Sequence, residues 1–230
     1  MCRLNIKIVA ILAMAVGSLS ANWHPLKLMK AYNGRDFTLK NGVEYVEVKK
    51  VHVFEPYHSK AKKRVKKSRV LRLYREPLSS FSAKVRKDFK NLPLSAKKSK
   101  SFMHGGQGHL GGSEHWYYNG FMLDSNLKTW RLESKEDLID MVKPIDTPAE
   151  AKLVMWVNGF AEDFLTYDNE YKAKYKKVGK NYIVKEHYKV TDTAYGDCGI
   201  YTYKSKVTRD GRVLNRRLIQ KAPTKICGGE

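Results

Sequence analysis

Residues Glu133–Phe160, with the sequence ESKEDLIDMVKPIDTPAEAKLVMWVNGF, form the most apolar segment downstream of residue 21 and contain two helix signals. Ser134 is a suitable N-cap, and the acidic residues that follow it complement the helix dipole. Thr147 and Glu150 have the spacing of a capping box, and Gly159 is a typical helix end. We therefore expect two consecutive helices. The second should be buried because it is apolar on nearly all sides.

Alternating apolar and polar residues surround this segment and predict antiparallel strands. A hairpin over residues 115–132 precedes the helices. Four strands in a meander should follow them, at residues 171–175, 182–190, 200–207 and 212–219. The predicted fold class is α+β: two consecutive helices packed on a C-terminal antiparallel β-meander, preceded by a basic N-terminal β-hairpin and loop region. The expected regions are 1–21, 22–57 (hairpin), 58–100 (basic linker with an amphipathic segment) and 101–230 (α+β domain).

The first 21 residues have the pattern of a secretory signal peptide. Arg3 and Lys7 precede the apolar run Ile8–Val16, and small residues lead to a cleavage site after Ala21. The apolar run is too short to span a bilayer, and no comparable run occurs later in the chain. We therefore expect a secreted or periplasmic protein with no transmembrane segment in its mature form. An uncleaved N-terminal anchor is the alternative.

Cysteine usage agrees with an oxidising compartment. Cys2 lies within the signal peptide, so Cys198 and Cys227 are the pair that remains after cleavage. An even pair in an exported protein is expected to form a disulfide. The alternative is a catalytic thiol at Cys198, which would need a nearby histidine base. We favour the disulfide.

The net charge of +21 is concentrated in the first half of the chain. Residues 22–100 carry 22 basic and 6 acidic residues, a net charge of +16, whereas residues 101–230 carry a net charge of +3. Seven of the ten residues 60–69 are basic, and they are candidates for binding phosphates or other anions. A solvated, partly disordered arm fits the same composition. The seven candidates are Lys60, Lys62, Lys63, Arg64, Lys66, Lys67 and Arg69.

A short basic amphipathic helix is expected after this run, because Phe81, Val85 and Phe89 are spaced by four residues. Such a helix could lie on an anionic membrane surface. We favour the alternative, in which its three apolar side chains dock on the protein core.

Three histidines occur within a glycine-rich segment, at His104, His109 and His115, with Glu114 beside the last. Imidazoles together with a carboxylate can hold zinc or another transition metal. The spacing matches no established zinc motif, and a flexible surface loop explains the same composition. Zinc is therefore the one cofactor that we consider, and this segment is its candidate site.

The chain contains no serine nucleophile elbow, Walker loop, dinucleotide fingerprint or zinc-protease motif. We therefore favour a secreted or periplasmic, non-enzymatic binding protein over an enzyme. It would engage an anionic envelope polymer, an anionic lipid or an acidic protein through its basic N-terminal half. Export disfavours nucleic acid as the partner. The alternative function is metal binding or metal-dependent hydrolysis at His104, His109 and His115.

Overall fold

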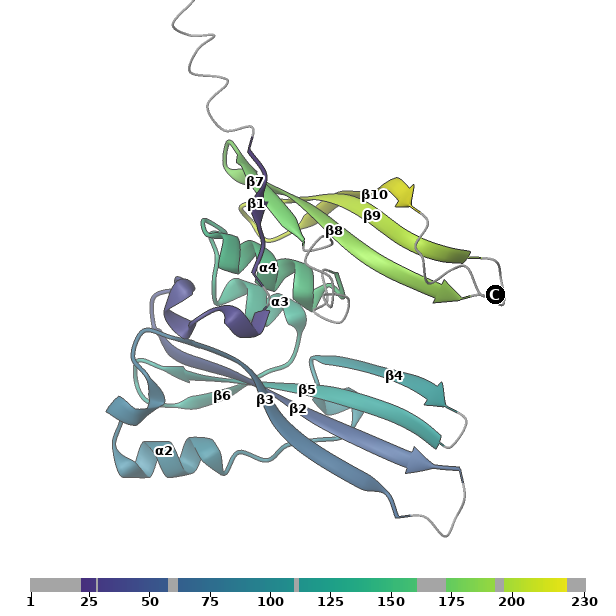
Figure 1. Cartoon of the computed structure of the whole chain (residues 1–230). Helices are drawn as coiled ribbons and strands as arrows, with labels where there is room; N and C mark the ends of the chain where they lie inside the picture. Colours follow the sequence, from purple (N-terminus) through teal and green to yellow (C-terminus); the bar gives the residue numbers. More distant parts are fainter. Residues whose placement is uncertain are drawn as a thin grey trace, which may run out of the picture. The chain divides into compact units, whose positions relative to one another are not determined.

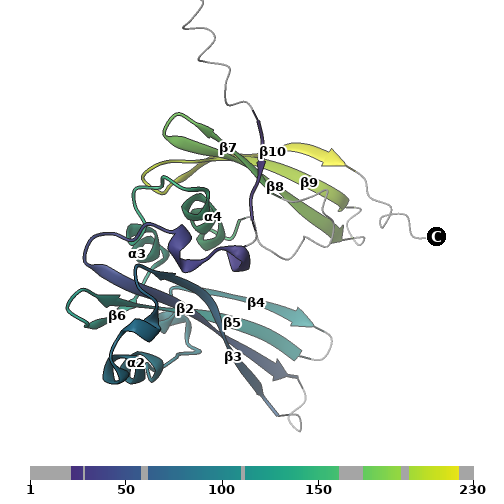
Figure 2. The same cartoon turned by 60° about the vertical axis from the view of Figure 1, so that its left-hand side comes forward.

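The computed structural model describes residues 22–27, 29–57, 62–109, 112–160, 173–192 and 197–222, without the side chains of residues 30, 106–109, 188–192 and 197–198. The chain divides into two compact units (Figure 1 and Figure 2). Unit 2 comprises Lys27–Asp163 together with Arg209–Arg212. Unit 1 comprises the chain up to Leu26, Phe164–Thr208 and Val213–Glu230.

Unit 2 is built on a five-stranded antiparallel sheet in the order β3-β2-β5-β4, with β6 paired to β5. The central strands are long because β-branched and aromatic residues alternate with polar ones. Its strands are β2 (Val43–Pro56), β3 (Arg64–Tyr74), β4 (Met103–His109), β5 (Gly112–Asp124) and β6 (Thr129–Leu132).

Helices cover both faces of this sheet at one end. On one face, Phe89 of α2 (Ala83–Lys90) packs with Tyr45, Phe121 and Leu123, and Phe81 and Val85 pack against this cluster. The amphipathic segment therefore docks on the core, as we expected. On the other face, the ring of Trp156 meets Tyr118 edge-on at 5.5 Å between ring centroids. Short 3-10 helices are η1 (Met29–Ala31), η2 (Gly34–Asp36), η3 (Leu78–Ser80) and η4 (Lys98–Lys100).

The two helices expected in Glu133–Phe160 are present as α3 (Lys135–Asp140) and α4 (Pro148–Val157). Ser134 and Thr147 are their N-caps, each with a complete capping box, and Ala149–Val157 are buried throughout. The carboxylate of Glu150 accepts backbone hydrogen bonds from Thr38 at 2.8 Å, Asp146 at 2.7 Å and Thr147 at 3.0 Å. This buried side chain therefore joins the start of α4 to the segment that precedes β2.

Unit 1 contains a second five-stranded antiparallel sheet, in the order β1-β7-β8-β9-β10. Four C-terminal strands are present as expected, and each pairs with the next along the chain, although the first extends to Val178 rather than ending at residue 175. The short N-terminal strand β1 pairs with β7 and forms one edge of the sheet. The strands are β1 (His24–Pro25), β7 (Lys174–Val178), β8 (Asn181–Asp192), β9 (Asp197–Val207) and β10 (Val213–Ala222).

The predicted fold class is wrong in its architecture. The described chain is mostly β, with two five-stranded antiparallel sheets and three short α-helices among the described residues. The expected basic hairpin and loop region contributes β2 and β3 to a five-stranded sheet, and α3 and α4 belong to the same unit as that sheet rather than to the unit of the C-terminal meander. Local signals identify strands and caps, but strand partners distant in sequence are decided by packing.

Two local expectations in the first half are also wrong. Residues 22–57 do not form the expected hairpin, because β2 is the long strand of this region and it pairs with β3 and β5. The histidine-glycine segment is not a loop, because residues 103–109 form β4 against β5. Within the residues that the structure describes, no helix is long and apolar enough to cross a membrane.

Candidate anion-binding site

A β-bulge in β3 brings two arginines to the same face of the unit 2 sheet. Arg69 pairs with Lys49, and Arg72 pairs with Glu47, so β3 has one residue more than β2 between these pairs. On a regular strand, residues three positions apart point to opposite faces. The extra residue, Val70, returns Arg72 to the face of Arg69.

The side chain of Glu47 lies at the centre of these cations and is 3 % exposed. Its Oε2 atom is 3.3 Å from Arg69 Nε and 3.6 Å from Arg72 Nε, and its Oε1 atom is 3.5 Å from Lys49 Nζ. We call these four residues the Glu47 cluster. One carboxylate faces three cations, so the cluster keeps a net positive charge available to an external anion.

The hydroxyl of Tyr45 donates a hydrogen bond of 2.6 Å to Glu47 Oε2. Burial raises the pKa of the Tyr45 phenol, and the hydrogen bond to the carboxylate raises it further. Tyr45 therefore remains a proton donor at physiological pH. This bond holds the carboxylate in the orientation that positions the two arginines.

A pocket of about 520 Å³ opens beside the Glu47 cluster, and we call it the cationic pocket. Arg86 of α2 is anchored at its rim, because Nη1 donates to the backbone oxygens of Ser79 at 3.0 Å and Phe81 at 3.2 Å. Among its described lining residues, four are basic and none is acidic. The lining consists of Tyr45, Arg69, Arg72, Tyr74, Pro77, Leu78, Ser79, Arg86 and Lys90.

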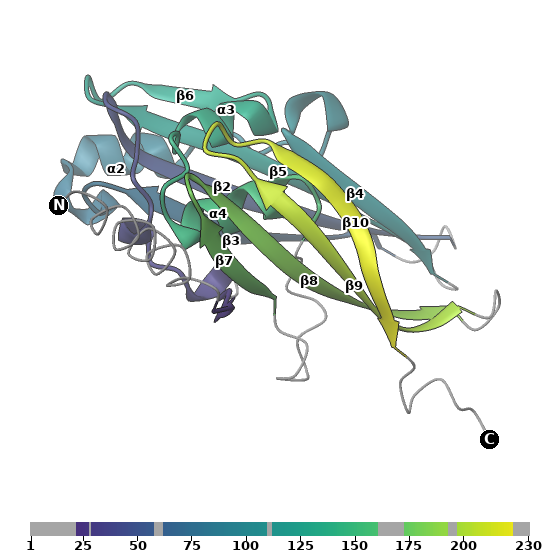
Figure 3. The ribbon, with the colours of Figure 1, turned by 90° about the horizontal axis from the view of Figure 1, so that it is seen from above.

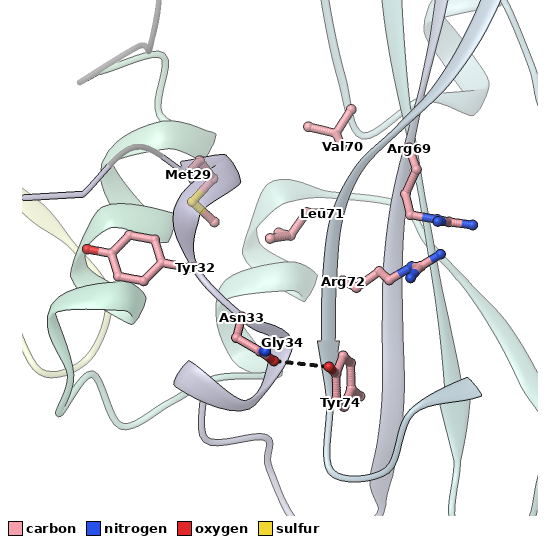
Figure 4. Close-up of a pocket in the computed structure, with 9 residues that line it drawn as sticks. All are labelled: Met29, Tyr32, Asn33, Gly34, Arg69, Val70, Leu71, Arg72 and Tyr74. Carbon is pink, nitrogen blue, oxygen red and sulfur yellow. Dashed lines mark hydrogen bonds between the residues drawn. The ribbon is translucent and has the colours of Figure 1, made fainter. Parts of the chain in front are cut away.

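A smaller cavity of about 280 Å³ lies on the other side of β3, against η1 and η2. Figure 4 shows that Arg69 and Arg72 extend away from Met29 and Tyr32, on opposite sides of the β3 ribbon. The Tyr74 hydroxyl donates to Asn33 Oδ1 at 3.0 Å (Figure 4). This contact holds η2 against the end of β3. Because Arg69 and Arg72 extend to the other side of β3 from Met29 and Tyr32, their head groups face the cationic pocket.

The structure divides the predicted basic run between two faces of one strand. Lys67 pairs with Val51 and shares the face of Arg69, whereas Arg64 and Lys66 lie on the opposite face. Residues 64–69 are part of β3, so this part of the run is not a disordered arm. Lys62 and Lys63 are exposed just before β3, and Lys63 Nζ forms an ion pair with Glu55 Oε1. Lys60 lies outside the described residues.

Sequence reasoning missed three of the four basic residues that line the cationic pocket, namely Arg72, Arg86 and Lys90. Arg72 lies beyond the basic run and joins Arg69 only through the bulge. The other two lie on the amphipathic helix, whose docking brings its basic residues towards β3. The sequence signal that could have identified Arg86 and Lys90 was the apolar docking stripe of α2 together with the basic residues beside it.

The metal hypothesis stays a prediction. His104 pairs with Tyr117, two residues from His115, so these two histidines share a face of the β4–β5 pair. The side chain of His109 lies outside the described residues. Glu114 does not join them, because its Oε2 is 3.3 Å from His52 Nε2 on the opposite face. Among the described residues, no group of three or more His, Cys, Asp or Glu could hold a metal ion.

The predicted signal peptide and the predicted disulfide fall outside what the structure describes. Residues 1–21 and Cys227 are not among the described residues, and the side chain of Cys198 is not described. Both remain predictions. Comparison with known proteins adds no family: no protein-family model, curated protein or solved structure matches this chain.

Proposed function

We propose that this protein is an exported, non-enzymatic binding protein whose unit 2 binds the anionic groups of an envelope polymer. The observation that carries the proposal is the cationic pocket. It brings Arg69, Arg72, Arg86 and Lys90 around a volume of about 520 Å³, a size typical of ligand sites. Export rests on the pattern of residues 1–21.

The chemistry of the pocket favours phosphate-bearing groups. Guanidinium groups bind phosphate through two parallel hydrogen bonds, and the Glu47 cluster holds two of them side by side. The side chains of Arg69 and Arg72 are 48 % and 43 % exposed, so both remain accessible to a ligand. Tyr74 and Leu78 supply apolar wall that can contact the sugar or acyl part of such a polymer.

The test is binding to immobilised lipopolysaccharide, which carries phosphate groups, across a series of salt concentrations. We expect the double variant R72Q/K90Q to bind roughly tenfold more weakly than the wild type, because it removes two charge-assisted contacts. The fold should survive, since Glu47 keeps Tyr45, Lys49 and Arg69 as partners. Circular dichroism and thermal unfolding would verify this.

The matched control is K84Q/K87Q, which removes the same charge from exposed positions of α2 that do not line the pocket. We expect it to change the affinity by less than about twofold, as for exposed charges outside a binding site. Equal weakening in both double variants would mean that binding depends on net charge alone. That result, or unchanged binding by R72Q/K90Q, would contradict the proposed site.

A further inference from the structure

Four cations lie in a row across the unit 1 sheet. Lys174 of β7 pairs with Lys185 of β8, Lys185 pairs with Lys204 of β9, and Lys204 pairs with Arg217 of β10. Residues paired in this way share a face of the sheet. Figure 3 shows these four strands in succession. We call the four residues the cationic row.

The row brings like charges together, which has an energetic cost. Like charges directly opposite each other on neighbouring strands destabilise a sheet. Among the described residues, none of the four cations forms an ion pair with a carboxylate. Lys176 and Lys206 extend the positive charge, because each pairs with Ile183 beside the row. An external anion would relieve this repulsion.

A β-bulge in β10 completes the row. Between the pairs Leu214–Lys206 and Arg217–Lys204, two residues of β10 oppose one residue of β9. Arg216 turns to the other face, where its Nε donates to buried Glu186 at 2.7 Å. Arg217 is thereby directed to the face of the row. A hollow of about 430 Å³ at this bulge is lined by Ile183, Lys204, Ser205, Lys206, Asn215, Arg216 and Arg217.

We propose that the cationic row binds a linear polysaccharide that carries at least one anionic group on each sugar residue. Neighbouring strands lie about 4.8 Å apart, which is close to the length of one pyranose residue along an extended chain. A polysaccharide that crosses the strands at right angles can therefore place successive sulfate or carboxylate groups opposite successive cations. This site is separate from the cationic pocket of unit 2 and does not depend on it.

The surroundings of the row favour a polysaccharide over other polyanions. Single-stranded nucleic acid is bound by aromatic side chains that stack on the bases. The aromatic ring beside the row is Trp23, and it is already covered by Lys185 Nζ at 4.3 Å and Lys176 Nζ at 5.4 Å from the ring centroid. A membrane surface needs apolar side chains that insert between lipids. Among the described residues that pair beside the row on this face, the apolar ones are Ile183, which is partly buried, and Leu214, which is 36 % exposed, and two such side chains offer little for insertion into a membrane.

The experiment uses the full mature chain and a fluorescently labelled heparin hexasaccharide, with affinity measured by anisotropy at low salt. We expect K185Q/K204Q to bind about tenfold more weakly than the wild type, because it removes the two central charges of the row. The variant should fold, since it relieves like-charge repulsion. The matched control is K180Q/K221Q, in which one lysine lies in a turn and the other pairs with Tyr201 on the opposite face.

His187 provides a local readout that separates this site from the cationic pocket. Burial lowers the pKa of His187, and the charges of Lys174 and Lys185 lower it further. A bound polyanion should therefore raise this pKa, measured by NMR titration of the imidazole, in the wild type and equally in R72Q/K90Q. In K185Q/K204Q the hexasaccharide should leave the pKa nearly unchanged.

Three results would overturn the proposal. The first is equal weakening of hexasaccharide binding by K185Q/K204Q and K180Q/K221Q. The second is an unchanged His187 titration in the presence of saturating hexasaccharide. The third is tighter binding of an oligothymidine of equal charge, or of phosphatidylglycerol vesicles, with the same sensitivity to K185Q/K204Q. That outcome would assign the row to nucleic acid or to a membrane surface.

Discussion

At the scale of single residues, Glu47 shows how one buried carboxylate organises a basic surface. Its side chain is almost fully buried, yet its partners Arg69 and Arg72 are about half exposed. An unpaired buried carboxylate would be costly, so the surrounding cations and Tyr45 must stay in place. The arrangement orients the arginines before any ligand arrives, which lowers the entropy cost of binding.

Tyr45→Phe tests this arrangement. The variant removes the 2.6 Å hydrogen bond to Glu47 while it keeps the ring in the core. Hydrogen bonds to charged groups contribute about 1.5–3 kcal/mol, and we expect the free energy of unfolding to fall by about that amount. Urea unfolding measures it. Tyr57→Phe, at a position that is 62 % exposed, is the control and should change stability by less than about 0.5 kcal/mol. A smaller loss for Tyr45→Phe than for the control would contradict the role given to Tyr45.

At the scale of elements, β-bulges and one buried helix have different roles. The bulge of β3 places Arg69 and Arg72 on the same face of the unit 2 sheet. The bulge of β10 places Arg216 and Arg217 on opposite faces of the unit 1 sheet. Helix α4 carries no candidate chemistry, and its side chains from Ala149 to Val157 are buried. The proposed binding sites therefore depend on strand register, whereas we expect the stability of unit 2 to depend on helix packing.

Leu153→Ala measures the contribution of α4. Leu153 is fully buried, so its truncation removes apolar contacts and leaves a cavity. We expect the free energy of unfolding to fall by about 2–5 kcal/mol, measured by chemical denaturation. Val65→Ala, on β3 at 50 % exposure, is the comparison and should cost less than about 1 kcal/mol. Similar losses for the two variants would show that α4 is not part of a tightly packed core.

At the scale of the whole molecule, the positive charge is distributed over two units, each with its own sheet and its own candidate site. The basic run at residues 60–69 supplies only Arg69 to the lining of the cationic pocket. The cationic row lies within residues 101–230, which carry a net charge of only +3. Net charge over a sequence window therefore does not locate binding faces. The spatial arrangement of a few cations does.

The predicted export concerns the whole chain, and mass spectrometry tests it. When expressed in a bacterium with an intact secretion pathway, the protein recovered from the periplasm should lack residues 1–21. Its mass should be lower by two further hydrogens when Cys198 and Cys227 form a disulfide. Leu12→Arg interrupts the apolar run and should keep the full-length chain in the cytoplasm. A full-length wild-type chain in the cytoplasm would contradict the predicted export.

The sequence by itself determined the local features of this protein. The N-caps at Ser134 and Thr147, the four C-terminal strands and the docking stripe of α2 are read from neighbouring residues, because caps and periodicity act within a few positions. Only the tertiary structure decided which strands distant in sequence pair, as β2 does with β5, and which side chains the bulges bring to one face. Register between distant strands depends on packing against many partners at once, and one extra residue at Val70 changes which face Arg72 occupies. The cationic pocket follows from the register of β2 and β3, and the cationic row follows from the register of the C-terminal meander.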